Sequence, residues 1–319
     1  MIPSRVHFYW TGASLPWPYA YAVRSAALNG GLDQVVFHHT DAIASLDPWR
    51  FVTGTPRVET RRLDPDALLG RVPGLGERLV DLHRRVTAPV ARSNILRAAV
   101  LLLEGGIYLD LDTLTVRSLA PLLRDAGFLG VEHIVRPHFV HTHGTPLQKL
   151  RATLLSTLRN GLRVMPRGYR LFPAVAPLYH QAINGAVLGA RAGHPVLEQY
   201  LHAMVDLPVD QQVVKHGLGT HLLQRVVAQY LESAPPHGGP AALVVHDPEV
   251  FYPLGPEISE HWFREYRSVD PTELIGPRTR VVHWYGSVGT LSLEARLTPD
   301  YVRENAARRL YCALVAPIL

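Results

Sequence analysis

Residues 91–113 read ARSNILRAAVLLLEGGIYLDLDT, and this stretch decides the architecture of the chain. Residues 91–104 predict a helix, and its second half, AAVLLL, is apolar on every side, which indicates a buried helix. Gly105 and Gly106 supply the helix stop. Residues 107–113 then predict a strand that enters a loop. A buried helix that leads directly into a strand is typical of an α/β sheet.

The rest of the chain repeats this alternation of strand and helix. Further strands are expected at 5–11, 34–39, 128–132, 184–189, 242–246 and 280–285, and further helices at 64–70, 75–85, 195–205 and 219–231. A length of 319 residues gives a prior of about two domains, although one α/β domain reaches this size. We expect one α/β domain over residues 1–319.

Composition excludes several classes of protein. The chain is 47% hydrophobic and 18% charged, which is neither a disordered polyelectrolyte nor a fibrous repeat. Cys312 is the single cysteine, so no disulfide can form within the chain. The N-terminus carries no secretory pattern, and no window approaches the eighteen or more apolar residues of a membrane helix. We expect a soluble, cytoplasmic protein with no transmembrane segment.

Asp110 and Asp112 stand two residues apart in the predicted strand. Side chains with this spacing share one face of a strand, so both carboxylates can converge on one cation where the strand ends. An oxygen-only pair suits Mg²⁺ or Mn²⁺ that also bridges substrate phosphates. Two aspartates near a strand end are also typical of a turn.

The start of the helix is expected beside these aspartates. The helix rises about 15 Å from Asn94 to its end, and the strand returns about 20 Å to Asp112. Asn94 and Arg97 share a helical face, so both would lie beside the metal. The alternative is a solvated first turn in which Arg97 forms a surface ion pair.

The run from 91 to 97, followed by 104–113, closely resembles the DXD-containing sugar-transferase signature of glycosyltransferase family 32, which has relatives among the large clostridial glucosylating toxins. The resemblance implies a GT-A-like, Rossmann-related single domain with a mixed central sheet flanked by helices. It also implies a metal-dependent hexosyltransferase that moves a sugar, with retention, from a nucleotide diphosphate sugar to an acceptor that the sequence does not identify.

Weaker similarity covers roughly residues 1–290. Residues 2–3 and 7–10 resemble the opening strand of the family, which implies that Trp10 lies against the nucleobase; the alternative is a core tryptophan. His283 to Ser287 (HWYGS) resembles the terminal segment that closes the metal and diphosphate site. His283 would then contact the metal, and the alternative is a core histidine. Later landmarks occur in order at 183–185, 193–195, 217–220 and 251–254.

The resemblance therefore implies three overlapping sets of residues. The metal ligands are Asp112, Asp110 and His283; the catalytic residues are Asp110, Asp112 and Arg97; the donor contacts are Trp10, Asn94, Arg97, Asp110 and Ser287. Two positions depart from the family. Asn94 replaces an aspartate that accepts hydrogen bonds from sugar hydroxyls, and an amide both donates and accepts, so the preferred sugar can differ. Val288 replaces a tryptophan.

Two rival functions remain open. A phosphohydrolase also places Asp-x-Asp after an apolar strand, but usually near the start of its domain and with Thr or Val where this chain has Leu114. A catalytically silent module that binds a sugar or nucleotide is the other rival, and the intact aspartate pair argues against it.

Residues 133–197 hold eight arginines or lysines and no acidic residue. The whole chain carries +5 and this segment +8, so the remainder carries −3. We expect a basic insertion around 133–180 that forms a lid or the acceptor side of the site, with some of Arg159, Arg163, Arg167 and Arg170 facing an anionic acceptor or membrane. A nucleic-acid surface is not favoured, because the aromatic residues form no repeated platform. Three histidines within 138–143 indicate a loop rather than a zinc site.

Overall fold

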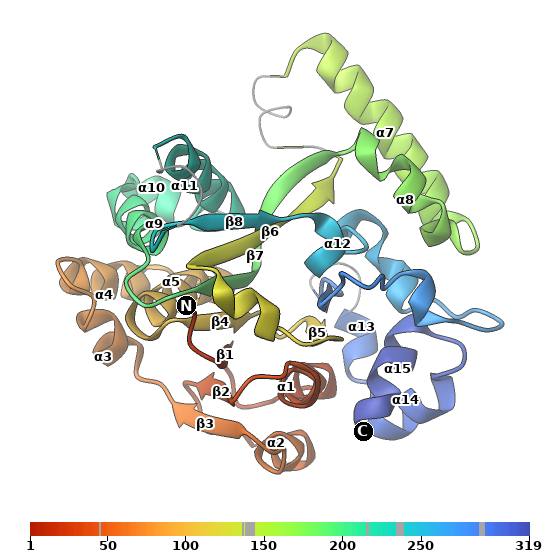
Figure 1. Cartoon of the computed structure of the whole chain (residues 1–319), viewed down its shortest axis with the longest axis horizontal. Coiled ribbons are helices and arrows are strands. Elements are labelled where there is room, and N and C mark those ends of the chain that lie inside the picture. The colour runs from red at the N-terminus through yellow and green to blue at the C-terminus, as the bar shows by residue number, and fades with distance from the viewer. Residues whose placement is uncertain (45, 136, 138–143, 215–216, 234–238, 287–290) are drawn as a thin grey trace.

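The structure, a computed structural model, describes residues 1–319 except 45, 136, 138–143, 215–216, 234–238 and 287–290. A seven-stranded sheet of order β3-β2-β1-β4-β7-β6-β8 lies at its centre (Figure 1). The strands are β1 (Arg5–Trp10), β2 (Gln34–His39), β3 (Val58–Arg62), β4 (Gly106–Leu109), β6 (Gly127–Ile134), β7 (His180–Ala190) and β8 (Leu243–His246). The first four run parallel, whereas β7 is antiparallel to both β4 and β6. The expected mixed sheet is confirmed.

Helices cover both faces of this sheet. Alternate residues of β4 face different cores: Tyr108 belongs to one, and Ile107 and Leu109 to the other. The first core contains residues of α3 (Pro65–Gly70), α4 (Gly76–Arg85), α5 (Pro89–Glu104), α9 (Pro195–Asp206) and α11 (Thr220–Ser233). The second contains residues of α1 (Trp17–Asn29) and α2 (Leu46–Thr53). The helices expected from the sequence lie in the first core.

The α5–β4 connection is as tight as the sequence predicts. Gly105 and Gly106 take φ angles of 66° and 113°, which side chains rarely adopt. A Cβ atom on Gly105 would also stand 2.7 Å from the backbone nitrogen of Ala192. Both glycines are therefore needed for the chain to reverse from a buried helix into a buried strand.

The strand that carries the aspartates ends earlier than expected. β4 stops at Leu109, Asp110 lies beyond it, and Asp112 is in a turn. The backbone nitrogen of Asp110 still donates to Ala186 O on β7 at 2.8 Å, and the Thr113 hydroxyl then closes the turn on Asp110 O at 2.7 Å. The prediction that both aspartates share one face of a strand is therefore wrong.

The chain continues from this turn into a second, two-stranded sheet. β5 (Thr113–Thr115) pairs antiparallel with β9 (Val281–His283), and Thr113 stands opposite His283. This pairing brings the predicted closing segment to the aspartate turn. A third apolar core beneath it contains Trp262, Trp284 and Tyr311.

An insertion separates β6 from β7. It contains α7 (Pro146–Val164), η2 (Gly168–Arg170), α8 (Phe172–Val175) and η3 (Ala176–Leu178), and Figure 1 shows α7 at the edge of the molecule, beyond the end of the sheet. Thr145 caps α7 and forms a capping box with Gln148. Most of the predicted histidine loop falls outside the described residues.

Acidic residues of the same chain pair with the basic residues of this insertion. Arg159 pairs with Glu257, Arg163 with Glu260 and Arg170 with Glu273. The Arg167 guanidinium donates to Ser268 O at 2.8 Å. For Arg159, Arg163 and Arg170 the expectation of an outside anionic partner is wrong, because carboxylates of the same chain compensate their charges. The Ser268 carbonyl does not compensate the charge of Arg167, for which the expectation stays a prediction.

The remaining elements complete the third core and the edges of the fold. They are η1 (Ala120–Arg124), α10 (Val209–Gln212), α12 (Pro248–Phe251), η4 (Pro256–Trp262), η5 (Pro271–Glu273), α13 (Leu291–Glu294), α14 (Pro299–Asn305), α15 (Leu310–Val315) and η6 (Ala316–Ile318). Among the described residues, no helix combines the length and the apolarity needed to cross a membrane.

Candidate active site

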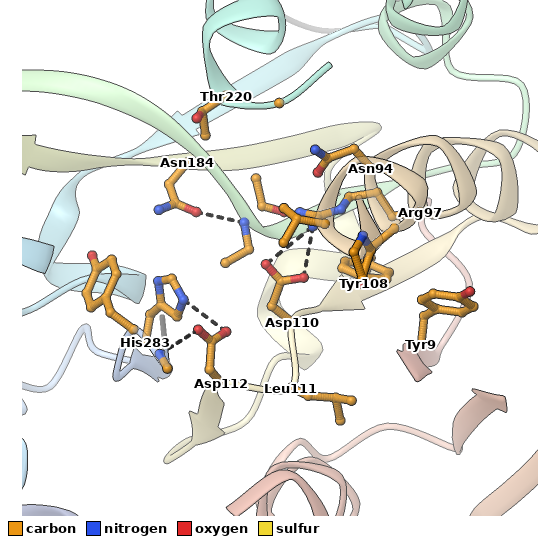
Figure 2. A pocket seen from close by; sticks show the side chains of 18 of the residues that line it. Tyr9, Asn94, Arg97, Tyr108, Asp110, Leu111, Asp112, Asn184, Thr220 and His283 are labelled. Carbon is orange, nitrogen blue, oxygen red and sulfur yellow. Dashed lines mark hydrogen bonds and ion pairs between the residues drawn. The ribbon is translucent and has the colours of Figure 1, made fainter. Parts of the chain in front are cut away.

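A cavity of about 510 Å³ opens where β1 and β4 end. Its lining comes from β1, α5, the aspartate turn, β6, β7 and β9. The strand order reverses here, because β2 and β4 lie on opposite sides of β1. Open α/β sheets bind ligands at such a switch point, beyond the carboxyl ends of their strands. Figure 2 shows Asn94, Arg97, Asp110, Asp112, Asn184 and His283 around this cavity.

Arg97 and Asp110 form an ion pair on one wall. Arg97 Nη2 lies 3.0 Å from Asp110 Oδ1, Nη1 donates to Gly185 O, and the guanidinium lies 4.7 Å from the centre of the Tyr108 ring. Arg97 is only 5% exposed, and its Nε has no hydrogen-bond partner. Burial raises the pKa of Asp110, and the charge of Arg97 opposes that rise. The alternative of a surface ion pair for Arg97 is therefore wrong, because the pair is enclosed in the cavity wall.

Asp112 forms a second pair, with His283. His283 Nε2 lies 3.0 Å from Asp112 Oδ1, and Gly286 N donates to Asp112 Oδ2 at 2.9 Å. Burial by itself would raise the pKa of Asp112, but the charge and hydrogen bond of His283 and the Gly286 N–H together lower it. Burial by itself would lower the pKa of His283, but the charge of Asp112, with those of Asp110 and Glu132, raises it. His283 Nδ1 is buried without a partner.

The three predicted metal ligands line one cavity, but they meet as two pairs rather than as one cluster. Within the described part of the chain, no group of three or more His, Cys, Asp or Glu side chains is gathered around a common point. Asp110 is engaged by Arg97, and Asp112 by His283. The donor chemistry nevertheless fits a divalent cation, because two carboxylates and an imidazole with an unpartnered nitrogen border the same space.

The predicted donor contacts are placed as follows. Asn94 is 8% exposed on α5 and lines the cavity on the same wall as Arg97 (Figure 2). Trp10 also lines it, at the end of β1; its Nε1 donates to Gly12 O at 3.0 Å and its ring lies 5.1 Å from that of Tyr19. Ser287 and Val288 lie outside the described residues.

Glu132 on β6 was not identified from the sequence. It lines the cavity, is 8% exposed, and accepts a hydrogen bond from the Tyr285 hydroxyl at 2.7 Å. Burial raises the pKa of Glu132. A carboxylate directly after the apolar run 127–131, within the same strand, was the available signal, because an acid in a central strand needs a partner or a function.

Asn184 on β7 faces the same space (Figure 2). Its Oδ1 accepts from Ala186 N at 2.7 Å, which fixes the carboxamide. The sequence marked 183–185 as a landmark without giving Asn184 a role. Glu132 and Asn184 come from neighbouring strands, so their position depends on the β6–β7 pairing.

The first comparison concerns sequence families. Residues 29–129 match the family described as "Glycosyltransferase sugar-binding region containing DXD motif". This range contains β2, the buried helix α5 and the aspartate turn, and it favours the glycosyltransferase prediction over the phosphohydrolase. No curated protein matches the chain.

Several solved structures of glycosyltransferases are similar to this chain. Mouse xyloside xylosyltransferase 1, in its apo form, has 13% identity and a TM-score of 0.48, with 90% of this chain and 99% of that chain covered. The PaToxG glycosyltransferase has 15% identity and a TM-score of 0.42, over 73% and 70%. The ligand-free glycosyltransferase domain of the YGT toxin has 7% identity and a TM-score of 0.43, over 77% and 80%.

Proposed function

We propose that this chain, whose residues 29–129 match a DXD-containing sugar-binding region of glycosyltransferases, transfers a sugar from a nucleotide diphosphate sugar to an acceptor, with a divalent cation and with retention. One observation carries the proposal: both DXD aspartates border a single cavity at the switch point of the sheet. An enclosed site of this kind suits a charged diphosphate, because electrostatic interactions are stronger away from water.

We propose that Asp112, Asp110 and His283 hold Mn²⁺ or Mg²⁺. When bound, the cation would neutralise the charge that develops on the diphosphate leaving group. The lowered pKa of Asp112 keeps this carboxylate ionised, as metal binding requires, whereas the raised pKa of His283 means that a cation would have to displace a proton from its imidazole. Ser287, from the same closing segment as His283, is a proposed donor contact.

Arg97 is proposed to hold Asp110 in place and to face the donor. Its bond to Gly185 O and its contact with Tyr108 fix the guanidinium, so that little conformational freedom is lost on binding. Asn94 lies on the same wall and would contact the hydroxyls of the donor sugar. Trp10 would lie against the nucleobase. These roles divide the cavity into a metal side at Asp112 and a donor side along α5.

We further propose that residues 1–319 act as a single catalytic domain. The central sheet uses strands from residue 5 to residue 246, and β9 near residue 283 completes the site. The insertion around 133–180 is proposed to border the acceptor side rather than to act as a lid, because its ion pairs with Glu257, Glu260 and Glu273 hold it against the body of the protein.

The test is a panel of UDP-, GDP- and dTDP-sugars with Mn²⁺ or Mg²⁺. A true donor should raise the apparent melting temperature, because it binds only the folded state, and should be hydrolysed slowly or transferred. Chelation of the cation should abolish turnover. Stabilisation by nucleotides without any turnover would indicate the catalytically silent module instead, and release of phosphate from a simple phosphate ester would indicate a phosphohydrolase.

A further inference from the structure

One face of α7 presents an exposed row of leucines. Leu147, Leu150, Leu154 and Leu158 have exposed fractions of 74, 56, 62 and 37%. Their spacing of three, four and four residues puts them along one side of the helix, over a length of about 17 Å. We call these four residues the outer leucine row. Large apolar side chains exposed together on one face mark an interaction surface.

The outer leucine row does not hold α7 in place. The opposite side of the helix does so, through Ala152, Leu155, Ser156 and Leu162, which are buried. Leu155 and Leu162 belong to the third core, and Leu162 O is bonded to His261 on η4. A helix with one apolar face satisfied by the protein and a second one left in water needs a further apolar partner for the second face.

Charge indicates what that partner is. α7 contains no acidic residue, and its inner arginines, Arg159 and Arg163, are paired with Glu257 and Glu260. Arg151 is exposed at the border of the row, whereas Lys149, also exposed, lies toward the other side of the helix. Arg151 donates to a carbonyl oxygen, that of Leu178 at 3.0 Å, which leaves its positive charge uncompensated. The outer side of α7 is therefore apolar and cationic.

We propose that the outer leucine row inserts into the surface of an anionic lipid bilayer, with Arg151 at the lipid phosphates. An apolar face flanked by basic residues is the pattern of a helix that lies in the membrane interface. A second copy of this chain fits less well, because the described face offers no carboxylate to Arg151 of the other copy.

This surface would also narrow the class of acceptor. The insertion that carries α7 starts where β6 ends, two residues after Glu132 in the cavity. A membrane bound at α7 would therefore favour an acceptor carried by the membrane, such as a lipid-linked sugar. This second step depends on the proposed function, whereas binding to lipid does not.

The experiment is flotation of the full chain with phosphatidylcholine vesicles, with and without 30 mol% phosphatidylglycerol, in low salt. The wild type should float with the anionic vesicles only. Leu150→Gln together with Leu154→Gln should reduce the bound fraction about tenfold, because the apolar insertion is lost. Leu231→Gln, at a leucine on α11 that is 45% exposed, is the matched control and should bind like the wild type.

Arg151→Gln should weaken binding about threefold and flatten its dependence on salt, and Lys149→Gln, on the other side of the helix, should have a smaller effect. Melting temperature and donor hydrolysis should stay unchanged in all of these variants, since none of the residues lines the cavity. Equal flotation of wild type and the double-leucine variant, or none for either, would overturn the proposal. So would a dimer of the wild type that the double-leucine variant converts to a monomer. Lipid binding without any donor hydrolysis would instead refute the proposed function alone.

Discussion

The cavity at the switch point of the sheet and the α7 insertion both contain several charged side chains, but they differ in how far those charges are exposed and paired. In the insertion, Arg163 and Glu260 form an ion pair whose members are 45% and 28% exposed. In the cavity, Arg97 and His283 are 6% and 8% exposed, and each keeps a buried nitrogen without a partner. Charge that is enclosed and incompletely satisfied costs stability, and folded proteins retain such groups mainly where a ligand uses them.

This difference shows that the charge composition of a segment does not by itself identify a binding surface. The acid-free segment 133–197 suggested an outside partner for its arginines, yet three of the four arginines highlighted there pair with carboxylates of the same chain. The cavity has no unusual composition. It is recognised by the burial and the altered pKa values of a few groups, such as Asp112 and His283.

The largest effect should come from the charge that the cavity encloses. Asp112→Asn should fold and lose at least about a hundredfold in sugar transfer, because it removes the carboxylate that His283 and Gly286 hold in place. Asp247→Asn, at an exposed aspartate paired with Arg278, is the matched control. Turnover with a fixed donor is the measurement. Near-normal sugar transfer by Asp112→Asn would contradict the view that the enclosed charges of the cavity, unlike the exposed pairs of the insertion, are used by a ligand.

A second test concerns buried histidines outside the cavity and the effect of their burial on the stability of the protein. His7 and His38 contact each other across β1 and β2 at 3.0 Å. Burial lowers the pKa of His7 to about 4 and that of His38 to about 3. The unfolded chain would bind protons below about pH 6.5, whereas the fold would not, so this stability is present above pH 6.5 and is lost as the pH falls.

From pH 7 to pH 5.5 the two histidines should together reduce the free energy of unfolding by about 2 kcal/mol. Urea unfolding at both pH values measures this change. His38→Gln should remove about half of it, while donor affinity at pH 7 stays as in the wild type. A pH dependence identical in the variant and the wild type would show that the pair is protonated in the fold.

A smaller effect is expected on the donor wall. Asn94→Asp should change the ranking of donors that share one nucleotide by several-fold, and should leave binding of the free nucleotide diphosphate almost unchanged, because only hydrogen bonds to the sugar are altered. Asn160→Asp, on the exposed side of α7, is the matched control. An unchanged donor ranking would leave Asn94 as a structural residue of α5.

The smallest effect should come from the paired arginines. Arg163→Gln should cost no more than about 1 kcal/mol, because an exposed ion pair contributes little. A double-mutant cycle with Glu260→Gln measures the coupling. Arg303→Gln, which removes another exposed ion pair, should lower the free energy of unfolding by a similar amount. A raised acceptor Michaelis constant for Arg163→Gln alone would place that arginine at the acceptor after all.

The sequence predicts local features well and distant pairings poorly. The buried helix α5 and its double-glycine stop follow from residues within one short stretch. The end of β4 at Leu109 was missed because the next strand, β5, has its partner at β9. Helix α1 was also missed, because eight of its thirteen residues are buried and it lacks a clear polar face.

The same reason explains the errors in the site. Asp112 and His283 could be named from motifs, but their contact depends on a pairing across the whole chain. Glu132 and Asn184 were overlooked because neither belongs to a motif of known chemistry, and only the β6–β7 register brings them to the cavity. The acidic partners of Arg159 and Arg163 lie 98 and 97 residues away, beyond any local pattern.

The pairing of β5 with β9 has a consequence for how the protein becomes active. Gly286 and Asp112, which share a hydrogen bond, are separated by 174 residues. A contact of such long range carries a large loop-closure cost and forms late in folding. During synthesis, the complete DXD motif would leave the ribosome long before His283 does. A nascent chain would therefore carry the motif without a finished site, and activity would begin only after β9 joins β5.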